Sequence, residues 1–167
     1  MSEHTLTLLR HAKSSWKDPT LTDMERPLNK RGRRDAATMG LQLKEYGTTF
    51  KIIFSSPARR TRETITSMLL TLPAQDTQLT FDQGFYIFER DELLQAIRQL
   101  DDKLKDVMIV GHNPAMHDTL RWLTGEAIAE FPTCAAAQLS LSLPHWKKIQ
   151  KGCAHLRWVL LPKSTTT

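Results

Sequence analysis

Three short apolar runs alternate with segments of helical periodicity, and this alternation limits the folds that the chain can adopt. The runs lie at residues 4–9, 51–55 and 107–111, and their composition is typical of strands buried in a parallel sheet. Each is followed by residues spaced as on one face of a helix. These faces comprise Ala36, Met39, Gly40 and Leu43; Thr61, Ile65, Met68 and Leu72; Leu93, Ile97 and Leu100; and Met116, Leu120 and Leu123. The alternation predicts a three-layer α/β/α fold with right-handed crossovers and a mostly parallel central sheet.

The pattern changes after Thr133, where strand-like alternation replaces helical periodicity. The segment AAQLSLSL, residues 136–143, alternates between small or polar residues and leucine, and a second β-rich run, HLRWVLL, follows at residues 155–161. This pattern predicts an antiparallel hairpin that closes the carboxyl-terminal edge of the sheet. We expect one domain over residues 1–163 and a frayed tail over residues 164–167.

The length and composition of the chain exclude several classes of protein. At 167 residues, one core buries enough apolar surface for stability without disulfides or a structural metal. Cys134 and Cys153 are the only thiols, too few and too far apart for a secreted disulfide framework or a zinc knuckle, so we expect a reducing cytoplasm. Charges precede any long apolar run, and no run reaches about 18 apolar residues, so we expect neither a signal peptide nor a membrane span.

Unusual polar residues follow all three predicted parallel strands. The first strand runs into RHAK at residues 10–13, the second into SSPARR at residues 55–60, and the third into GHNP at residues 111–114. Because the carboxyl ends of parallel strands form the ligand crevice of an open α/β sheet, the three clusters should meet. Two of them place proline where a helix would start, with Ser56 and Asn113 as candidate caps. Helix amino termini and a net charge of +5 favour an anionic ligand such as phosphate.

Each cluster also has a simpler interpretation. Arg10 with His11 is compatible with a surface pair, the arginines that open the second helix with a solvated basic face, and His112 with an ordinary turn residue. Cations at a helix amino terminus oppose the helix dipole, however, and that opposition costs stability unless a function requires it. Three simpler interpretations would have to hold at three strand ends that the fold brings together, so we favour the functional one.

Other phosphate-binding chemistries and metal sites lack their motifs. The chain contains neither GxxxxGK[ST] nor GxGxxG, and no arginine follows Cys134 at the spacing that a cysteine phosphatase loop requires. The histidines of the strand-end motifs have no acidic neighbours there, and the others are scattered without ligand spacing. These others are His4, His117, His145 and His155. We therefore expect neither a metal nor a cofactor.

His11 has the surroundings of a nucleophile. Nearby positive charge disfavours protonation, so the arginines around His11 should keep its imidazole neutral at neutral pH. A neutral histidine can form a covalent phosphoryl intermediate. Arg10 and Arg60 can then bind the transferring phosphoryl group through bidentate hydrogen bonds. His112 completes this predicted phosphate clamp.

The strand-end motifs resemble those of the histidine phosphatase superfamily, which includes phosphoglycerate mutases and acid phosphatases. The resemblance rests on RHA at residues 10–12, on SPxxR ending at Arg60, and on GHNP at residues 111–114. Within the superfamily, LLRHAKS, RPLNKRG, SSPARRTRET and VGHNP are most similar to the SixA-type phosphohistidine phosphatases. FPT at residues 131–133 and the final LP-K pattern extend this similarity over nearly the whole chain.

The resemblance implies roles for four residues. His11 would be the residue that is phosphorylated, and Arg10 and Arg60 would bind the phosphate. His112 would be the second histidine of the pocket. One departure from the superfamily pattern is Ala12, which replaces the usual glycine after the catalytic histidine with a sterically small change.

The proton donor that larger relatives use has no clear counterpart in this chain. In those relatives a glutamate or aspartate protonates the leaving alcohol. Here Asp82, Glu89 and Asp91, in the segment FDQGFYIFERDE, are candidates, but none stands in a recognisable motif. The general acid is therefore left unassigned.

Residues 12–29 show neither helical nor strand periodicity and contain two prolines. A connection of this length is uncommon in a compact domain unless it has a function. We expect it to form a loop over the site; an irregular surface excursion with a short helix is the alternative.

The sequence predicts a metal-independent phosphatase that acts through phospho-His11, with phosphohistidine on a partner protein as the favoured substrate. A small phosphorylated substrate, cleaved by a phosphomonoesterase of the same superfamily, is the alternative. From other classes, a phosphate-sensing domain without turnover and a nucleic-acid-binding module stay open. The KRGRR run at residues 30–34 suits nucleic acid, but its charges cover several helix faces without interleaved aromatic residues, so we expect no nucleic-acid partner.

Overall fold

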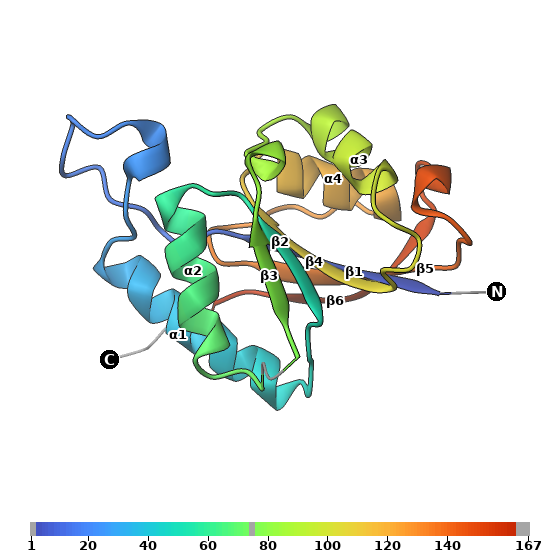
Figure 1. Ribbon diagram of the computed structural model, residues 1–167, viewed down its shortest axis with the longest axis horizontal. Helices are drawn as coiled ribbons and strands as arrows, with labels where there is room; N and C mark the ends of the chain where they lie inside the picture. Colours follow the sequence, from blue (N-terminus) through green and yellow to red (C-terminus); the bar gives the residue numbers. More distant parts are fainter. Residues whose placement is uncertain (1–2, 74–75, 163–167) are drawn as a thin grey trace.

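A mixed sheet with a parallel centre forms the middle of the fold (Figure 1). The structure, a computed structural model, describes residues 3–73 and 76–162, so the tail expected at residues 164–167 lies outside the described residues. The strands are β1 (His4–Arg10), β2 (Ile52–Ser55), β3 (Gln78–Phe81), β4 (Asp106–Gly111), β5 (Ala136–Leu141) and β6 (Ala154–Leu160). Their order is β3-β2-β4-β1-β5-β6, in which β3, β2, β4 and β1 pair in parallel and β5 pairs antiparallel with both β1 and β6. The predicted parallel centre and antiparallel carboxyl-terminal edge are confirmed.

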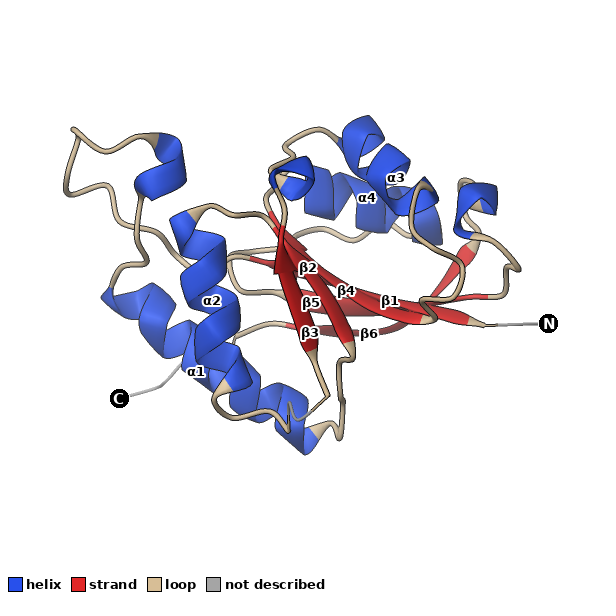
Figure 2. Cartoon of the chain, viewed as in Figure 1, coloured by secondary structure: helices blue, strands red, loops and turns tan. Residues whose placement is uncertain are grey.

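Helices cover both faces of the sheet (Figure 2). Helices α1 (Lys30–Glu45) and α2 (Arg59–Leu69) lie on one face, and α3 (Arg90–Arg98) and α4 (Ala115–Thr124) lie on the other. Successive strand residues point to opposite faces, so Met108 of β4 packs in the core beneath α1 and α2, whereas Ile109 packs in the core beneath α3 and α4. The three predicted layers are therefore present. Short 3₁₀ helices lie at Asp23–Glu25, Gln83–Phe85 and Trp146–Lys148.

The strand β3 and the ends of two helices differ from the sequence-based prediction. Strand β3 was not predicted. Its sequence, QLTF, is short and mostly exposed at the sheet edge, so it lacks the apolar run that marks the buried strands. Helix α2 ends at Leu69 and α3 at Arg98, although the periodic pattern continues to Leu72 and Leu100. Within the described residues, no helix combines the length and the apolar character needed to cross a membrane.

The predicted caps Ser56 and Asn113 are wrong as N-cap positions. Ala58 is the N-cap of α2 and Pro114 is the N-cap of α4, because both helices begin later than the proline pattern suggests. Both polar side chains still stabilise the helix starts. The Ser56 hydroxyl accepts from the amide of Ala58 at 3.3 Å, and the side-chain oxygen of Asn113 accepts from the amide of His117 at 3.1 Å.

Residues 12–29, which we term the strap, leave the body of the fold and return to it. An antiparallel bridge between Ser14 and Leu28 closes the base of the strap. The start of α1 packs directly against this base: a Cβ atom at Gly32 would lie 2.1 Å from the carbonyl oxygen of Lys13. The close approach of α1 to the strap therefore requires a glycine at this position.

Candidate active site

Three side chains from separate parts of the chain meet at the carboxyl ends of the parallel strands. His11 follows β1, Arg60 lies in the first turn of α2, and His112 follows β4. The register pairs Arg10 with Gly111, so the residues after β1 and β4 leave the sheet at the same level. Arg60 Nε donates to His11 Nε2 at 3.4 Å, and Arg60 Nη2 lies 3.2 Å from His112 Nδ1. The two imidazole centroids are 5.3 Å apart, so the predicted convergence of these three residues is present.

One ring nitrogen of His11 carries the proton, and the other keeps a lone pair. Its Nδ1 lies 2.7 Å from the carbonyl oxygen of Ala12; a carbonyl only accepts, so Nδ1 carries the proton. The amide of Ala12 donates to the hydroxyl of Thr64 in α2 at 2.9 Å, which fixes this part of the backbone. His11 Nε2 keeps its lone pair and faces Arg60. Nε2 is therefore the atom available for nucleophilic attack.

His112 has the opposite tautomer. A guanidinium only donates, so His112 Nδ1 accepts from Arg60, and the proton lies on Nε2, which donates to the Ser56 hydroxyl at 2.8 Å. Phe88 stacks on the His112 ring with centroids 4.7 Å apart, and Tyr86 packs against it edge-on at 5.3 Å. These contacts hold His112 in place. Ser56, which was predicted only as a helix cap, therefore also orients a histidine of the site.

Burial keeps both histidines neutral. Burial lowers the pKa of His11 to about 3; the Ala12 carbonyl opposes this shift, and the charges of Arg60 and Arg10 add to it. Burial also lowers the pKa of His112 to about 2, again with help from Arg60. The predicted neutral state of His11 is thus supported, but its main cause is desolvation and not the flanking arginines.

The two lowered pKa values predict that the protein loses stability in acid. In the unfolded chain both histidines bind protons near pH 6.5, whereas in the fold they stay neutral down to about 3 for His11 and about 2 for His112. Above pH 6.5 both histidines are neutral in the folded and the unfolded chain, so they do not lower the free energy of unfolding there. As the pH falls from 6.5 toward 3, the unfolded state gains protons that the native state does not bind, and each histidine removes up to about 1.4 kcal/mol of unfolding free energy per pH unit.

Denaturant titrations at pH 7, 6 and 5 measure this loss of stability. His112→Gln should flatten the pH dependence, whereas replacing the exposed His155 by alanine should leave it unchanged. An unfolding free energy that is constant from pH 7 to pH 5 would contradict the neutral state of the two buried rings.

Two further arginines bring unpaired N–H groups to the site. Arg10 Nη1 donates to the carbonyl oxygen of Phe131 at 3.2 Å, but its buried Nε has no partner among the described residues. Arg26, on the strap, is 7% exposed, and its buried Nε and Nη1 likewise have no partner there. Unpaired buried donors are costly, and the charges of both arginines reach His11, so the site favours an anion. Arg26 was not among the predicted site residues, although it opens the RPLNKRG motif.

Comparison with known proteins agrees with this geometry. Residues 6–85 match the model of the histidine phosphatase superfamily, branch 1. An uncharacterized chloroplastic protein of Arabidopsis thaliana is 35% identical over 151 residues, which cover 86% of this chain and 69% of that protein. The chain belongs to the histidine phosphatase superfamily. The predicted superfamily assignment is thereby confirmed.

Two further relatives lie within the same superfamily. A structure assigned as the phosphohistidine phosphatase SixA of Agrobacterium tumefaciens superimposes with a TM-score of 0.80 and 26% identity, covering 96% of this chain and 99% of that one. A 2,3-bisphosphoglycerate-dependent phosphoglycerate mutase of Bartonella henselae is 34% identical over 86 residues, 46% of this chain and 38% of the mutase. The similarity to this SixA structure spans almost the whole of both chains and confirms the predicted resemblance, whereas the similarity to the mutase is partial.

The three carboxylates that were candidates for the general acid do not contact His11 or His112 through hydrogen bonds. Asp82 caps a short 3₁₀ helix, Glu89 is the N-cap residue of α3, and the exposed Asp91 accepts from its neighbour Arg90 at 3.0 Å. Within the described residues, no hydrogen bond or ion pair joins any of the three carboxylates to the central histidines or to the arginine between them. None of the three is therefore assigned as the general acid.

The carboxylate that does reach the site is Asp23, which the sequence analysis missed. Arg60 Nη2 donates to its Oδ2 at 2.9 Å, and the Tyr86 hydroxyl donates to the same oxygen. Burial alone would raise the pKa of Asp23, but the hydrogen bonds from Tyr86 and Arg60 and the charges of Arg60 and Arg26 outweigh it and lower the pKa below its usual range. The strap therefore lies against the site, as predicted, and brings an ionised carboxylate to it.

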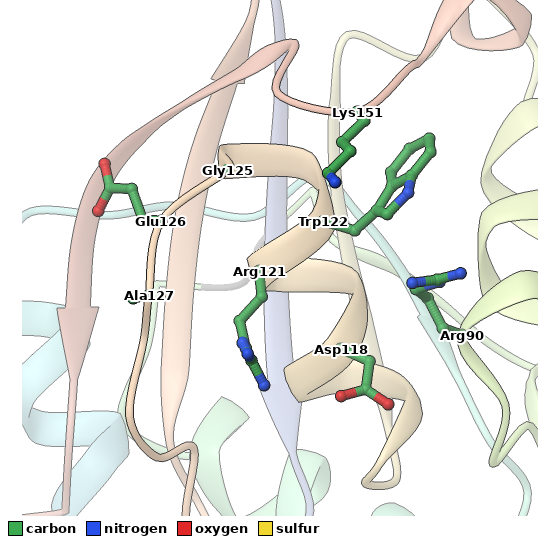
Figure 3. Close-up of a pocket in the computed structure, with 8 residues that line it drawn as sticks. All are labelled: Arg90, Asp118, Arg121, Trp122, Gly125, Glu126, Ala127 and Lys151. Carbon is green, nitrogen blue, oxygen red and sulfur yellow. The ribbon is translucent and has the colours of Figure 1, made fainter.

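Other features of the structure lie outside the histidine cluster. A surface cavity of about 490 Å³ beside α4 contains none of the predicted site residues (Figure 3); it is lined by Arg90, Asp118, Arg121, Trp122, Gly125, Glu126, Ala127 and Lys151. Burial raises the pKa of Cys134 to about 12, so this thiol stays protonated and unreactive. In the described part of the chain, no group of three His, Cys, Asp or Glu side chains is placed to hold a metal ion.

Proposed function

We propose that this superfamily member hydrolyses phosphohistidine on a partner protein, through a covalent phospho-His11 intermediate and without a metal. One observation carries the proposal. Within the described residues, Asp23 is the carboxylate hydrogen-bonded to the central cluster, and its lowered pKa keeps it ionised near neutral pH. The site therefore pairs a free nucleophile, His11 Nε2, with no carboxylic acid ready to protonate a leaving group.

The proposed reaction has two displacements at phosphorus. His11 Nε2 attacks the phosphoryl group while the P–N bond to the substrate imidazole breaks, and the bonding electrons leave with that imidazole. Arg60 and Arg10 balance the charge on the phosphoryl oxygens, and His112 completes the pocket. Water then attacks phospho-His11, the second P–N bond breaks, and both protons of the water leave with inorganic phosphate as dihydrogen phosphate. His11 Nε2 recovers its lone pair.

The choice of phosphohistidine follows from leaving-group chemistry. An alkoxide is strongly basic, and a positioned proton donor typically contributes about 10²- to 10⁴-fold to its departure. The imidazole of phosphohistidine can take a proton on its free ring nitrogen before the P–N bond breaks, so it needs no donor from the enzyme. The similarity to a SixA structure over almost the whole chain supports the same substrate class.

A small phosphomonoester is the second candidate substrate, favoured by the partial identity with a phosphoglycerate mutase over 86 residues. That candidate would require a neutral acid at the site.

We place the activity in the cytoplasm as part of the proposal, because Cys134 and Cys153 are free thiols.

A substrate panel tests the proposal. We expect rapid phosphate release from a phosphohistidine-bearing protein, slow release from aryl phosphates, and almost none from serine or sugar phosphates. Asp82→Asn, Glu89→Gln and Asp91→Asn should each leave phosphohistidine hydrolysis unchanged within about twofold, because the three carboxylates are exposed and none is hydrogen-bonded to the two histidines or to Arg60. A chelator should not inhibit, whereas vanadate should.

Two outcomes would contradict the proposal. Efficient hydrolysis of an alkyl phosphate that collapses on mutating one of those three carboxylates would favour a phosphomonoesterase. Phosphate binding without turnover of any substrate would favour a phosphate-sensing domain.

A further inference from the structure

The strap contacts the central arginine through one residue. Arg60 Nη1 donates to the main-chain oxygen of Asp23 at 2.6 Å, and Arg60 Nη2 donates to the Asp23 carboxylate at 2.9 Å. Two atoms of one residue thus bind the end of one guanidinium group. Charge-assisted pairs of this kind fix the plane of the guanidinium as well as its position.

The two edges of the Arg60 guanidinium have different partners. The end, formed by Nη1 and Nη2, faces Asp23. The side, formed by Nε and Nη2, faces the rings of His11 and His112. Phosphate oxygens bind to guanidinium edges of this kind in pairs. Because Asp23 holds the end, the side stays directed at the nucleophile, where a phosphoryl group must bind.

Asp23 is itself held from two directions. The Tyr86 hydroxyl donates to its Oδ2, and Arg26 Nη2 lies 3.5 Å from its Oδ1. Tyr86 also packs edge-on against His112, so one side chain contacts both the carboxylate and the site. The Asp23 side chain is 45% exposed while that of Arg60 is 2% exposed, so the carboxylate holds the buried cation from the solvent side.

We propose that Asp23 is a positioning residue, which orients Arg60 for the phosphoryl group, and that the strap completes the phosphate site in this way. The proposal deepens the proposed function and rests on it for the identity of the substrate. Asp23 does not touch the reacting atoms in this arrangement; it acts through Arg60. Tyr86 supports Asp23, and its hydroxyl should contribute in the same direction with a smaller effect.

A double-mutant cycle on phosphate binding tests this role. Inorganic phosphate is titrated calorimetrically into the protein, Asp23→Ala, Arg60→Ala and the double variant. Asp23→Ala should weaken binding about tenfold or more, the scale of one lost charge-assisted contact. Adding Asp23→Ala to Arg60→Ala should change the affinity by less than about twofold, because Asp23 then has no arginine to orient.

Conservative variants and a control on the same strap separate positioning from folding. Asp23→Asn keeps an acceptor but loses the charge, so it should fall between the parent protein and Asp23→Ala. Tyr86→Phe should weaken phosphate binding about two- to threefold, as expected for one lost neutral hydrogen bond. Asp18→Asn alters an exposed strap carboxylate that bonds only Thr20, and it should change nothing.

Two results would overturn the proposal. Tighter phosphate binding by Asp23→Ala would mean that Asp23 competes with the ligand for Arg60. An equal loss in the Arg60→Ala background would mean that Asp23 acts directly or through the fold. Because the measurement is binding and not turnover, it stays decisive even if the protein proves not to hydrolyse phosphohistidine, and the substrate panel reports that failure separately.

Discussion

The substitution His11→Ala is expected to remove the covalent intermediate and to lower turnover by about 10³-fold or more, the scale of losing an activated nucleophile. The structure supports this because Nδ1 carries the ring proton and donates it to the Ala12 carbonyl, whereas Nε2 is unprotonated and keeps the lone pair that attack requires. The parent protein is mixed with phosphohistidine substrate that carries a labelled phosphoryl group, and the reaction is quenched rapidly without acid. This should trap a labelled phosphoenzyme, which is stable to alkali and labile to acid. His11→Ala should show no such label.

The control for this experiment is a histidine outside the site. His155 lies exposed on β6, so His155→Ala should keep both the label and the turnover. His11→Ala removes a neutral, buried ring and leaves the Ala12 carbonyl without its donor, so its folding should be checked by thermal unfolding. Labelling or turnover that survives in a folded His11→Ala protein would refute the proposed mechanism.

The sequence was sufficient to predict which residues would meet, because the fold class determines where strand ends lie. Residues that follow parallel strands share one edge of the sheet, so placing RHAK, SSPARR and GHNP after such strands already predicted that His11, Arg60 and His112 would converge. The prediction needed neither exact helix boundaries nor exact caps. Strand β3 was not predicted, because an exposed edge strand has no apolar run in its sequence.

The loop over the site was predicted from the sequence, but the residue that it contributes to the site was not. Asp23 reaches Arg60 only because the chain from residue 12 to residue 29 folds back onto α2, and no local pattern encodes that return. The same holds for Tyr86, which lies between two segments that are remote in sequence and contacts both Asp23 and His112. A periodicity argument identifies elements and their order, but pairings between irregular segments depend on the tertiary structure.

The ionisation of His11 shows a similar limit. Its flanking arginines are visible in the sequence, and they do lower the pKa. The larger cause is burial, because the folded chain leaves His11 only 8% exposed. The sequence therefore predicted the direction of the pKa shift, whereas its main physical cause required the structure.

Arg60 and Arg59 offer a matched pair for the second large effect. Both lie in the first turn of α2, but the Arg60 side chain is 2% exposed between the histidines, whereas the Arg59 side chain is 50% exposed and pairs with Glu63. Arg60→Ala should lower kcat/KM by about 10²- to 10³-fold, the cost of losing a preorganised group that stabilises transition-state charge. Arg59→Ala should change it by less than about twofold, as expected for a surface ion pair. Steady-state kinetics on a phosphohistidine substrate compare the two.

The loss in Arg60→Ala is attributable to the missing guanidinium and not to a changed nucleophile. Removing Arg60 takes away one cause of the lowered pKa of His11, but burial, the larger cause, remains, so Nε2 should stay unprotonated near pH 7. The variant should therefore show the same deficit at pH 7 and at pH 8, whereas protonation of His11 would make the deficit shrink as the pH rises. Arg60→Lys retains the charge without the fork and should recover only part of the activity. Equal losses from Arg59→Ala and Arg60→Ala would show that the phosphate site is built on a different register of α2.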